Sequence, residues 1–125
     1  MKKIIGKVLE KANTDEFDFV ANKYFQGSYV EVMMKHILQE AKIIGEIIHR
    51  EAINPYFEKA TTINYLSDED ESIKSQSLYI IKVRPLAVIH KGHLKEVEFP
   101  PLPGSNVFEA DESDIRLALE QKIKV

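Results

Sequence analysis

Three of the five prolines of the chain lie within nine residues, in the segment from Phe99 to Val107. Proline fixes φ and lacks a backbone N–H donor, so these prolines cannot lie inside a helix or a central strand. Gly104 supplies the positive φ that a turn after Pro103 favours. The segment therefore predicts a stiff crossing between one extended run that ends at Phe99 and another that begins at Val107.

The length and composition are typical of a protein with a single domain. With 125 residues, the chain is long enough to bury a core, and its charged fraction of 30% is typical of soluble proteins. The absence of cysteine excludes disulfides and thiolate sites and fits a cytoplasmic protein. No apolar run approaches the roughly 18 residues that a membrane span needs. A net charge of −3 argues against strong nucleic-acid binding by the isolated chain.

Alternation of apolar and polar residues predicts strands on both sides of the crossing. Residues 3–11 and 17–20 flank the turn cluster 13–16 and form an expected hairpin. Residues 78–90 are the most strand-like stretch, in which Pro85 marks a bulge or an edge position. The turn Lys91-Gly92 should return the chain along residues 94–99. Residues 107–110 follow as a short strand, and a helix that leaves the domain should run from Ile115 to about Ile123.

Residues 30–48 allow two interpretations. Their apolar residues fall at helical spacing over nearly twenty positions, which predicts one amphipathic helix broken by Gly45. The alternative is two strands, Ser28–Lys35 and Lys42–Ala52, joined by a loop at residues 36–40. The isoleucines around Gly45 favour strands, since β-branched residues are enriched there. The pattern alone does not decide between them.

Many short strands with turn signals between them indicate a mainly β protein, either a small barrel or a sandwich. Asn54-Pro55 is typical of a helix start, because asparagine caps helices and proline suits the first helical position. We therefore expect a short helical insertion near residues 55–65.

The sequence offers no constellation for catalysis or for cofactor binding. It contains no phosphate-binding loop, no dinucleotide-binding fingerprint and no nucleophile elbow. His90 and His93 flank a turn, but a metal site needs three or four converging ligands. We expect no catalytic residue, no cofactor and no metal. Surface aromatic, histidine and proline residues are instead the candidate partner contacts, namely Tyr56, Phe57, His90, His93, Pro101 and Pro103.

Five segments in this order resemble the HAS-barrel, the N-terminal domain of HerA-family hexameric DNA translocases. They are Ile5-Gly6-Lys7-Val8, Glu16-Phe17-Asp18-Phe19, Gly27-Ser28-Tyr29-Val30-Glu31-Val32, Ile44-Gly45-Glu46-Ile47 with Asn54-Pro55-Tyr56, and Pro100-Pro101-Leu102-Pro103-Gly104-Ser105-Asn106-Val107. The family domain is similar to the N-terminal barrel of ATP synthase subunits. The resemblance implies a closed or nearly closed barrel of six to seven short strands over residues 1–110, in which the Gly45 segment is a strand. Residues 111–125 would be a helix leading toward an ATPase domain that is absent from the chain.

The resemblance also implies a function. The barrel would be a non-catalytic assembly and docking domain that supports hexamer formation and binds a partner nuclease, NurA, during processing of DNA double-strand break ends. Hexamers would form when the barrel is fused to the ATPase domain, and DNA would be contacted only through the full complex. The alternative is a stand-alone β-barrel that binds nucleic acid or acts as an adaptor. Neither interpretation involves a membrane.

Overall fold

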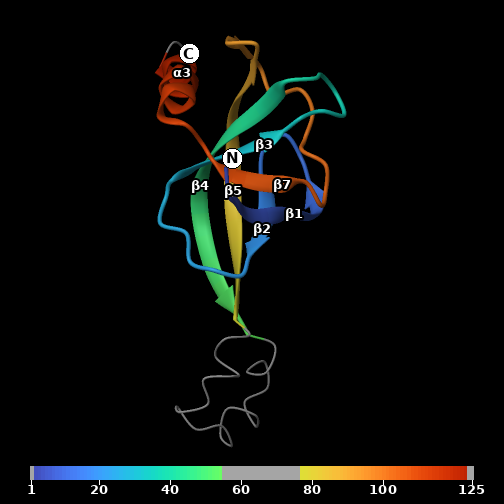
Figure 1. The fold of residues 1–125 in the computed structure, drawn as a ribbon, viewed down its shortest axis with the longest axis vertical. Coiled ribbons are helices and arrows are strands. Elements are labelled where there is room, and N and C mark those ends of the chain that lie inside the picture. Colours follow the sequence, from blue (N-terminus) through green and yellow to red (C-terminus); the bar gives the residue numbers. More distant parts are fainter. Residues whose placement is uncertain (1, 55–76, 124–125) are drawn as a thin grey trace, which may run out of the picture.

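A computed structural model describes residues 2–54 and 77–123 of the chain. Tyr56, Phe57 and the helical insertion expected near residues 55–65 lie outside this part. The described elements are, in order, β1 (Ile4–Ala12), β2 (Phe17–Ala21), β3 (Tyr29–Met33), β4 (Ala41–Ile53), β5 (Leu78–His90), β6 (His93–Lys95), β7 (Asn106–Glu109) and α3 (Glu112–Ile123) (Figure 1). Among the described residues, no helix is long and apolar enough to cross a membrane.

Six of these strands close into an antiparallel barrel. The order around it is β2-β1-β7-β3-β4-β5, and β5 pairs again with β2 to complete the ring. β6 lies outside the ring and pairs with β5 alone. The expected mainly β barrel is confirmed. The 13 residues of β5 match the predicted range 78–90, and β4, also of 13 residues, is one residue longer at each end than predicted. The far ends of both strands extend beyond the barrel (Figure 1).

The segment that allowed two interpretations forms two strands. β3 and β4 pair antiparallel from Tyr29 opposite Glu46 to Met33 opposite Lys42. The helical spacing arose because β4 buries side chains on both of its faces. Ile43 packs in the barrel core, and its neighbour Ile44 packs in a second apolar cluster outside the ring. A strand buried on both faces loses the alternation that distinguishes it from a helix.

The ring closes with the help of irregular positions. Ile44 pairs with Ala87 whereas Gly45 pairs with Pro85, so β5 carries one extra residue at this point. This is the bulge predicted at Pro85, and bulges increase the curvature that a small barrel needs. A Cβ atom on Gly45 would lie 2.3 Å from Cγ1 of Val83, so the close approach of β4 and β5 requires glycine here.

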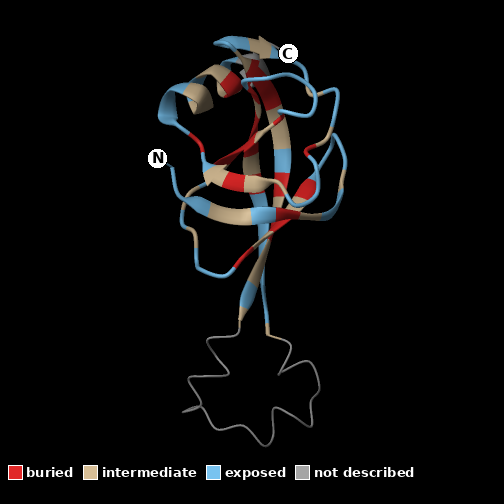
Figure 2. Cartoon of the chain, turned by 45° about the vertical axis from the view of Figure 1, so that its right-hand side comes forward, coloured by how far each residue is buried: buried red, intermediate tan, exposed pale blue. Residues whose placement is uncertain are grey.

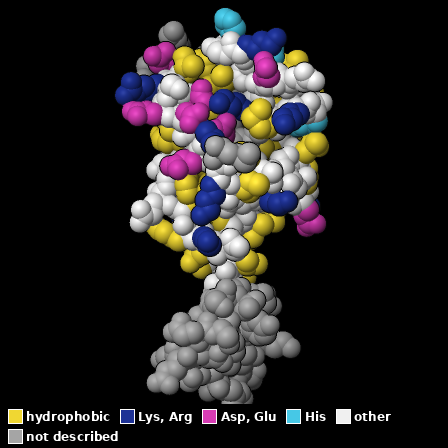
Figure 3. All heavy atoms as spheres, viewed as in Figure 1, with side chains coloured by type: hydrophobic (Ala, Val, Ile, Leu, Met, Phe, Trp, Pro, Cys, Tyr) yellow, Lys and Arg dark blue, Asp and Glu magenta, His cyan; other side chains and the backbone are white. Residues whose placement is uncertain are grey.

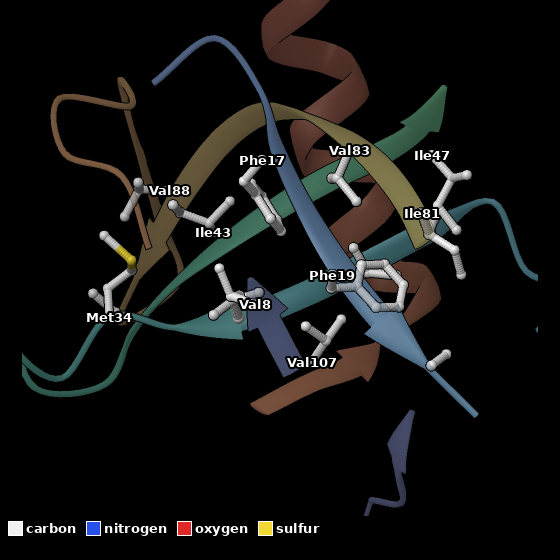
Figure 4. Close-up of a cluster of buried hydrophobic side chains, with 14 residues drawn as sticks. Val8, Phe17, Phe19, Met34, Ile43, Ile47, Ile81, Val83, Val88 and Val107 are labelled. Carbon is white, nitrogen blue, oxygen red and sulfur yellow. The ribbon is translucent and has the colours of Figure 1, made fainter. Parts of the chain in front are cut away.

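The barrel interior is filled by apolar side chains from all six strands. The largest fully buried ones include Phe17, Phe19, Ile43 and Ile81, several of which Figure 4 shows pointing toward one another. Burying each such side chain stabilises the fold by about 1.5–3 kcal/mol. Figure 2 shows that buried residues concentrate in the barrel, while the far end of β4 is exposed.

The helix α3 packs against the barrel, and its role as a connection toward a further domain stays a prediction. Ala118 of α3 is fully buried in the second apolar cluster, together with Ile44, Ala87 and Ile89 of the barrel wall. Alanine at this position lets the helix approach the wall closely. The predicted end of the helix at Ile123 agrees with α3, which begins at Glu112, three residues before the predicted range.

The proline crossing runs from the end of the β6 hairpin to β7. The strand expected over residues 94–99 is shorter than predicted, because regular pairing stops at Lys95 and the chain then turns toward the prolines. The N–H of Gly104 donates to the carbonyl oxygen of Val8 at 2.7 Å, and the N–H of Val8 donates to Ser105 at 2.9 Å. Gly104 has a φ of 84°, as the turn after Pro103 predicts. The crossing is thereby held along β1.

Candidate docking surface

An apolar groove of about 150 Å³ lies between the loop that joins β3 to β4 and the chain that follows β6. Three large apolar side chains line it while remaining exposed to solvent: Ile37 is 40%, Leu38 is 37% and Phe99 is 49% exposed. Met34 is buried and also lines the groove. Grouped exposed apolar side chains of this kind mark interaction sites on soluble proteins.

The β3–β4 loop presents two of these side chains on a fixed backbone. The N–H groups of Ile37 and Leu38 both donate to the carbonyl oxygen of Met34 at 3.0 Å. The N–H of Met34 donates to Ala41 at 2.7 Å and closes the base of the loop. Glu40 adopts a φ of 64° where the chain turns into β4. Because the loop is already ordered, it would lose little conformational entropy when a partner binds to it.

The opposite side of the groove is charged at its edge. Val88 on β5 pairs with Lys95 on β6, and both line the groove. Glu96 and Glu98 follow β6 and are exposed. An apolar centre with a charged rim is the usual composition of a protein–protein interface. The arrangement suits a partner that inserts an apolar side chain beside Phe99.

The structure places the predicted partner contacts at different depths. His90 is half-buried and His93 is exposed, and the two residues face each other across the β5–β6 hairpin beside the groove. Pro103 is exposed farther along the crossing. Pro101 is fully buried, so the expectation that it contacts a partner is corrected: its ring packs inside the fold. Tyr56 and Phe57 lie outside the described residues.

Sequence reasoning missed the three side chains that make the groove. The sequence pattern places Phe99 at the end of a strand, and Ile37 and Leu38 in a helix or a loop. One signal could have found the loop pair: two adjacent large apolar residues stand among His36, Gln39 and Glu40, where a solvated loop needs none. Their meeting with Phe99 depends on the barrel topology.

A network of ion pairs joins the N-terminal residues to β3, β4 and α3. At its centre, the Glu31 side chain is only 5% exposed. Lys2 contacts one of its carboxylate oxygens, and Lys42 lies 3.3 Å from the other. Lys42 also lies 2.6 Å from Asp114, and Lys2 lies 3.0 Å from Asp111. Figure 3 shows basic and acidic side chains intermixed on the surface next to α3.

This network also contains the one group of acidic residues, within the described part, whose spacing could suit a metal ion. One carboxylate oxygen from each of Glu31, Asp111 and Asp114 lies within 4.8 Å of the others. The ammonium groups of Lys2 and Lys42 already form ion pairs with all three carboxylates. A cation would have to displace both lysines, so these five residues form an ion-pair network that fixes the start of α3.

No family model matches the chain, and no curated protein is significantly similar to it.

Proposed function

We propose that the chain is a non-catalytic docking barrel of a cytoplasmic HerA-type DNA translocase. In this role it supports hexamer formation when fused to the ATPase domain. It also binds a NurA-type nuclease during the processing of DNA double-strand break ends. The proposal rests on the resemblance of five ordered segments to the HAS-barrel, and it is consistent with the closed six-strand ring.

The observation that most supports a docking role is the apolar groove. Ile37, Leu38 and Phe99 are exposed around one hollow, and the backbone of Ile37 and Leu38 is held by hydrogen bonds to Met34. Most binding energy at an interface comes from a few side chains that fill well-packed, desolvated pockets near its centre. We propose that the nuclease inserts an apolar side chain into this groove, with its polar groups reaching Lys95, Glu96 and Glu98.

The test compares the nuclease with DNA as a partner of the same chain. The purified chain is mixed with a NurA-type nuclease on a gel-filtration column, and is separately titrated with labelled single-stranded oligonucleotides at low salt. Co-elution with the nuclease, without tight DNA binding, is expected. Steeply salt-dependent DNA binding and no nuclease complex would instead support the stand-alone nucleic-acid-binding barrel.

A further inference from the structure

A second and larger groove, of about 940 Å³, lies on the part of the barrel next to the N-terminal residues. Three segments line it: residues 2–5 at the start of β1, residues 22–25 after β2, and residues 109–112 between β7 and α3, together with Ile115. Its volume lies within the range of binding pockets in proteins. None of these segments borders the apolar groove of the docking surface.

The first residues of β1 leave one strand edge open in this groove. On one side, β7 pairs with β1 as far as Ile4, which lies opposite Phe108. On the other side, β2 pairs with β1 at Lys7 opposite Val20, and β2 ends at Ala21. The chain bends at residues 22–23, where a longer β2 would have continued the ladder. Within the described residues, no strand pairs with this edge of Ile4 and Ile5, and such an edge is a template for an added strand.

A bulge and exposed apolar side chains accompany the open edge. The β1–β7 register shifts between Ile4 and Gly6, so β1 has an extra residue at this point. Ile4 is 49% exposed and Tyr24 is 65% exposed. The Tyr24 ring lies edge-on to Tyr79, at a centroid distance of 6.2 Å. Half-buried Phe25 and Ile115 add apolar surface to the groove.

Charge distinguishes the two sides of the groove. Among the described residues, neither Lys3 nor Lys23 has an acidic partner, whereas Lys2 is engaged by Glu31 and Asp111. On the α3 side, Glu112 is paired with Arg116 at 2.8 Å. The two unpaired lysines therefore lie on the side that also carries the open edge. They favour an occupant with a negative charge at that place.

We propose that this groove binds an extended, acidic peptide segment of a partner protein, which adds as a strand to the open edge of β1. An acidic side chain of the peptide contacts Lys3 and Lys23, and a neighbouring apolar side chain packs beside Phe25 and Ile115. Backbone hydrogen bonds to the edge supply affinity, and the side-chain contacts supply specificity, as in other cases of strand addition. This site is independent of the apolar groove and of the nuclease proposed to bind there.

The experiment selects peptides on the intact chain. A library of displayed random dodecapeptides is panned against the chain, and the enriched sequences are synthesised with a fluorescent label. We expect a shared acidic residue and amide chemical-shift changes at Ile4, Ile5 and Tyr24. The double variant Lys3→Glu/Lys23→Glu should bind about tenfold more weakly, since attraction becomes repulsion. A matched reversal of two exposed lysines that line neither groove, Lys11→Glu/Lys91→Glu, should leave the affinity unchanged.

Three results would overturn the proposal. The library yields no enriched peptide, or the enriched peptides bind the Lys3→Glu/Lys23→Glu variant as tightly as the native chain, or they shift the amides of Ile37 and Phe99 instead of those of Ile4 and Ile5. Circular dichroism confirms that both charge-reversed variants remain folded. Because the nuclease test uses other residues, either proposal can fail while the other stands.

Discussion

Replacement of Glu31 by glutamine tests the ion-pair network that holds α3 on the barrel. Breaking a buried ion pair by removing one partner costs about 3–5 kcal/mol. Two features of this network reduce that figure. Lys42 keeps Asp114 at 2.6 Å, and Lys2, whose side chain is 38% exposed, returns to water at little cost. We therefore expect Glu31→Gln to lower the free energy of unfolding by about 2 kcal/mol.

The free energy of unfolding is measured by urea denaturation at neutral pH, followed by circular dichroism. A loss of this size should also lower the Tm by about 8 °C in a domain of this length. The control is Glu109→Gln, which removes the same charge from an exposed residue and should change stability by no more than about 0.5 kcal/mol. Equal stabilities of the two variants would refute the reasoning, since the buried position of Glu31 would then contribute nothing.

Three further substitutions test the packing and the turns. Gly45→Ala should destabilise the barrel by about 2 kcal/mol in urea denaturation, because its Cβ would lie 2.3 Å from Val83; an unchanged midpoint would contradict this close approach. Gly104→Ala meets no atom within 4 Å but keeps a φ of 84°, so about 1 kcal/mol of backbone strain is expected by the same assay. Ala118→Glu places a carboxylate where the side chain is fully buried, and should lower the Tm and increase amide exchange along α3; native-like protection would show that the helix does not pack there.

Local chemistry explains which parts of the fold could be predicted. The turn at Lys91-Gly92 depends on two positive φ values, 51° and 80°, and glycine in second place suits such a hairpin turn. The bulge at Pro85 follows from the missing N–H of proline. The start of α3 is indicated by the acidic residues of its first turn, Glu112 and Asp114. Each of these features is determined by a few neighbouring residues.

Features that depend on distant segments could not be predicted in the same way. Ile43 and Ile44 are both buried only because α3 covers the outer face of β4, and this cover removed the alternation of a half-buried strand. Glu31 gave no sign of burial, because its partner Lys42 lies on another strand and Lys2 near the N-terminus.

The candidate docking surface also depends on contacts between segments that are distant in the sequence. Pro101 was expected at the surface because prolines in connecting segments usually are exposed, but the crossing is hydrogen-bonded to β1 and Pro101 is buried. The groove brings Phe99 next to the β3–β4 loop through strand pairing that no sequence pattern encodes. Only the adjacent pair Ile37-Leu38 gave a local sign of it.

The docking role is tested most directly by the affinity of a NurA-type nuclease for the native chain and for Leu38→Asp/Phe99→Asp, measured by isothermal titration calorimetry. Each substitution places a charge at the centre of the groove, so we expect at least about a hundredfold loss of affinity for the double variant. Ile48→Asp is the matched control, because Ile48 is similarly exposed, at 44%, on β4 and does not line the groove; it should bind as the native chain does. Equal affinity of all three proteins for the nuclease, or no binding by the native chain, would contradict the account.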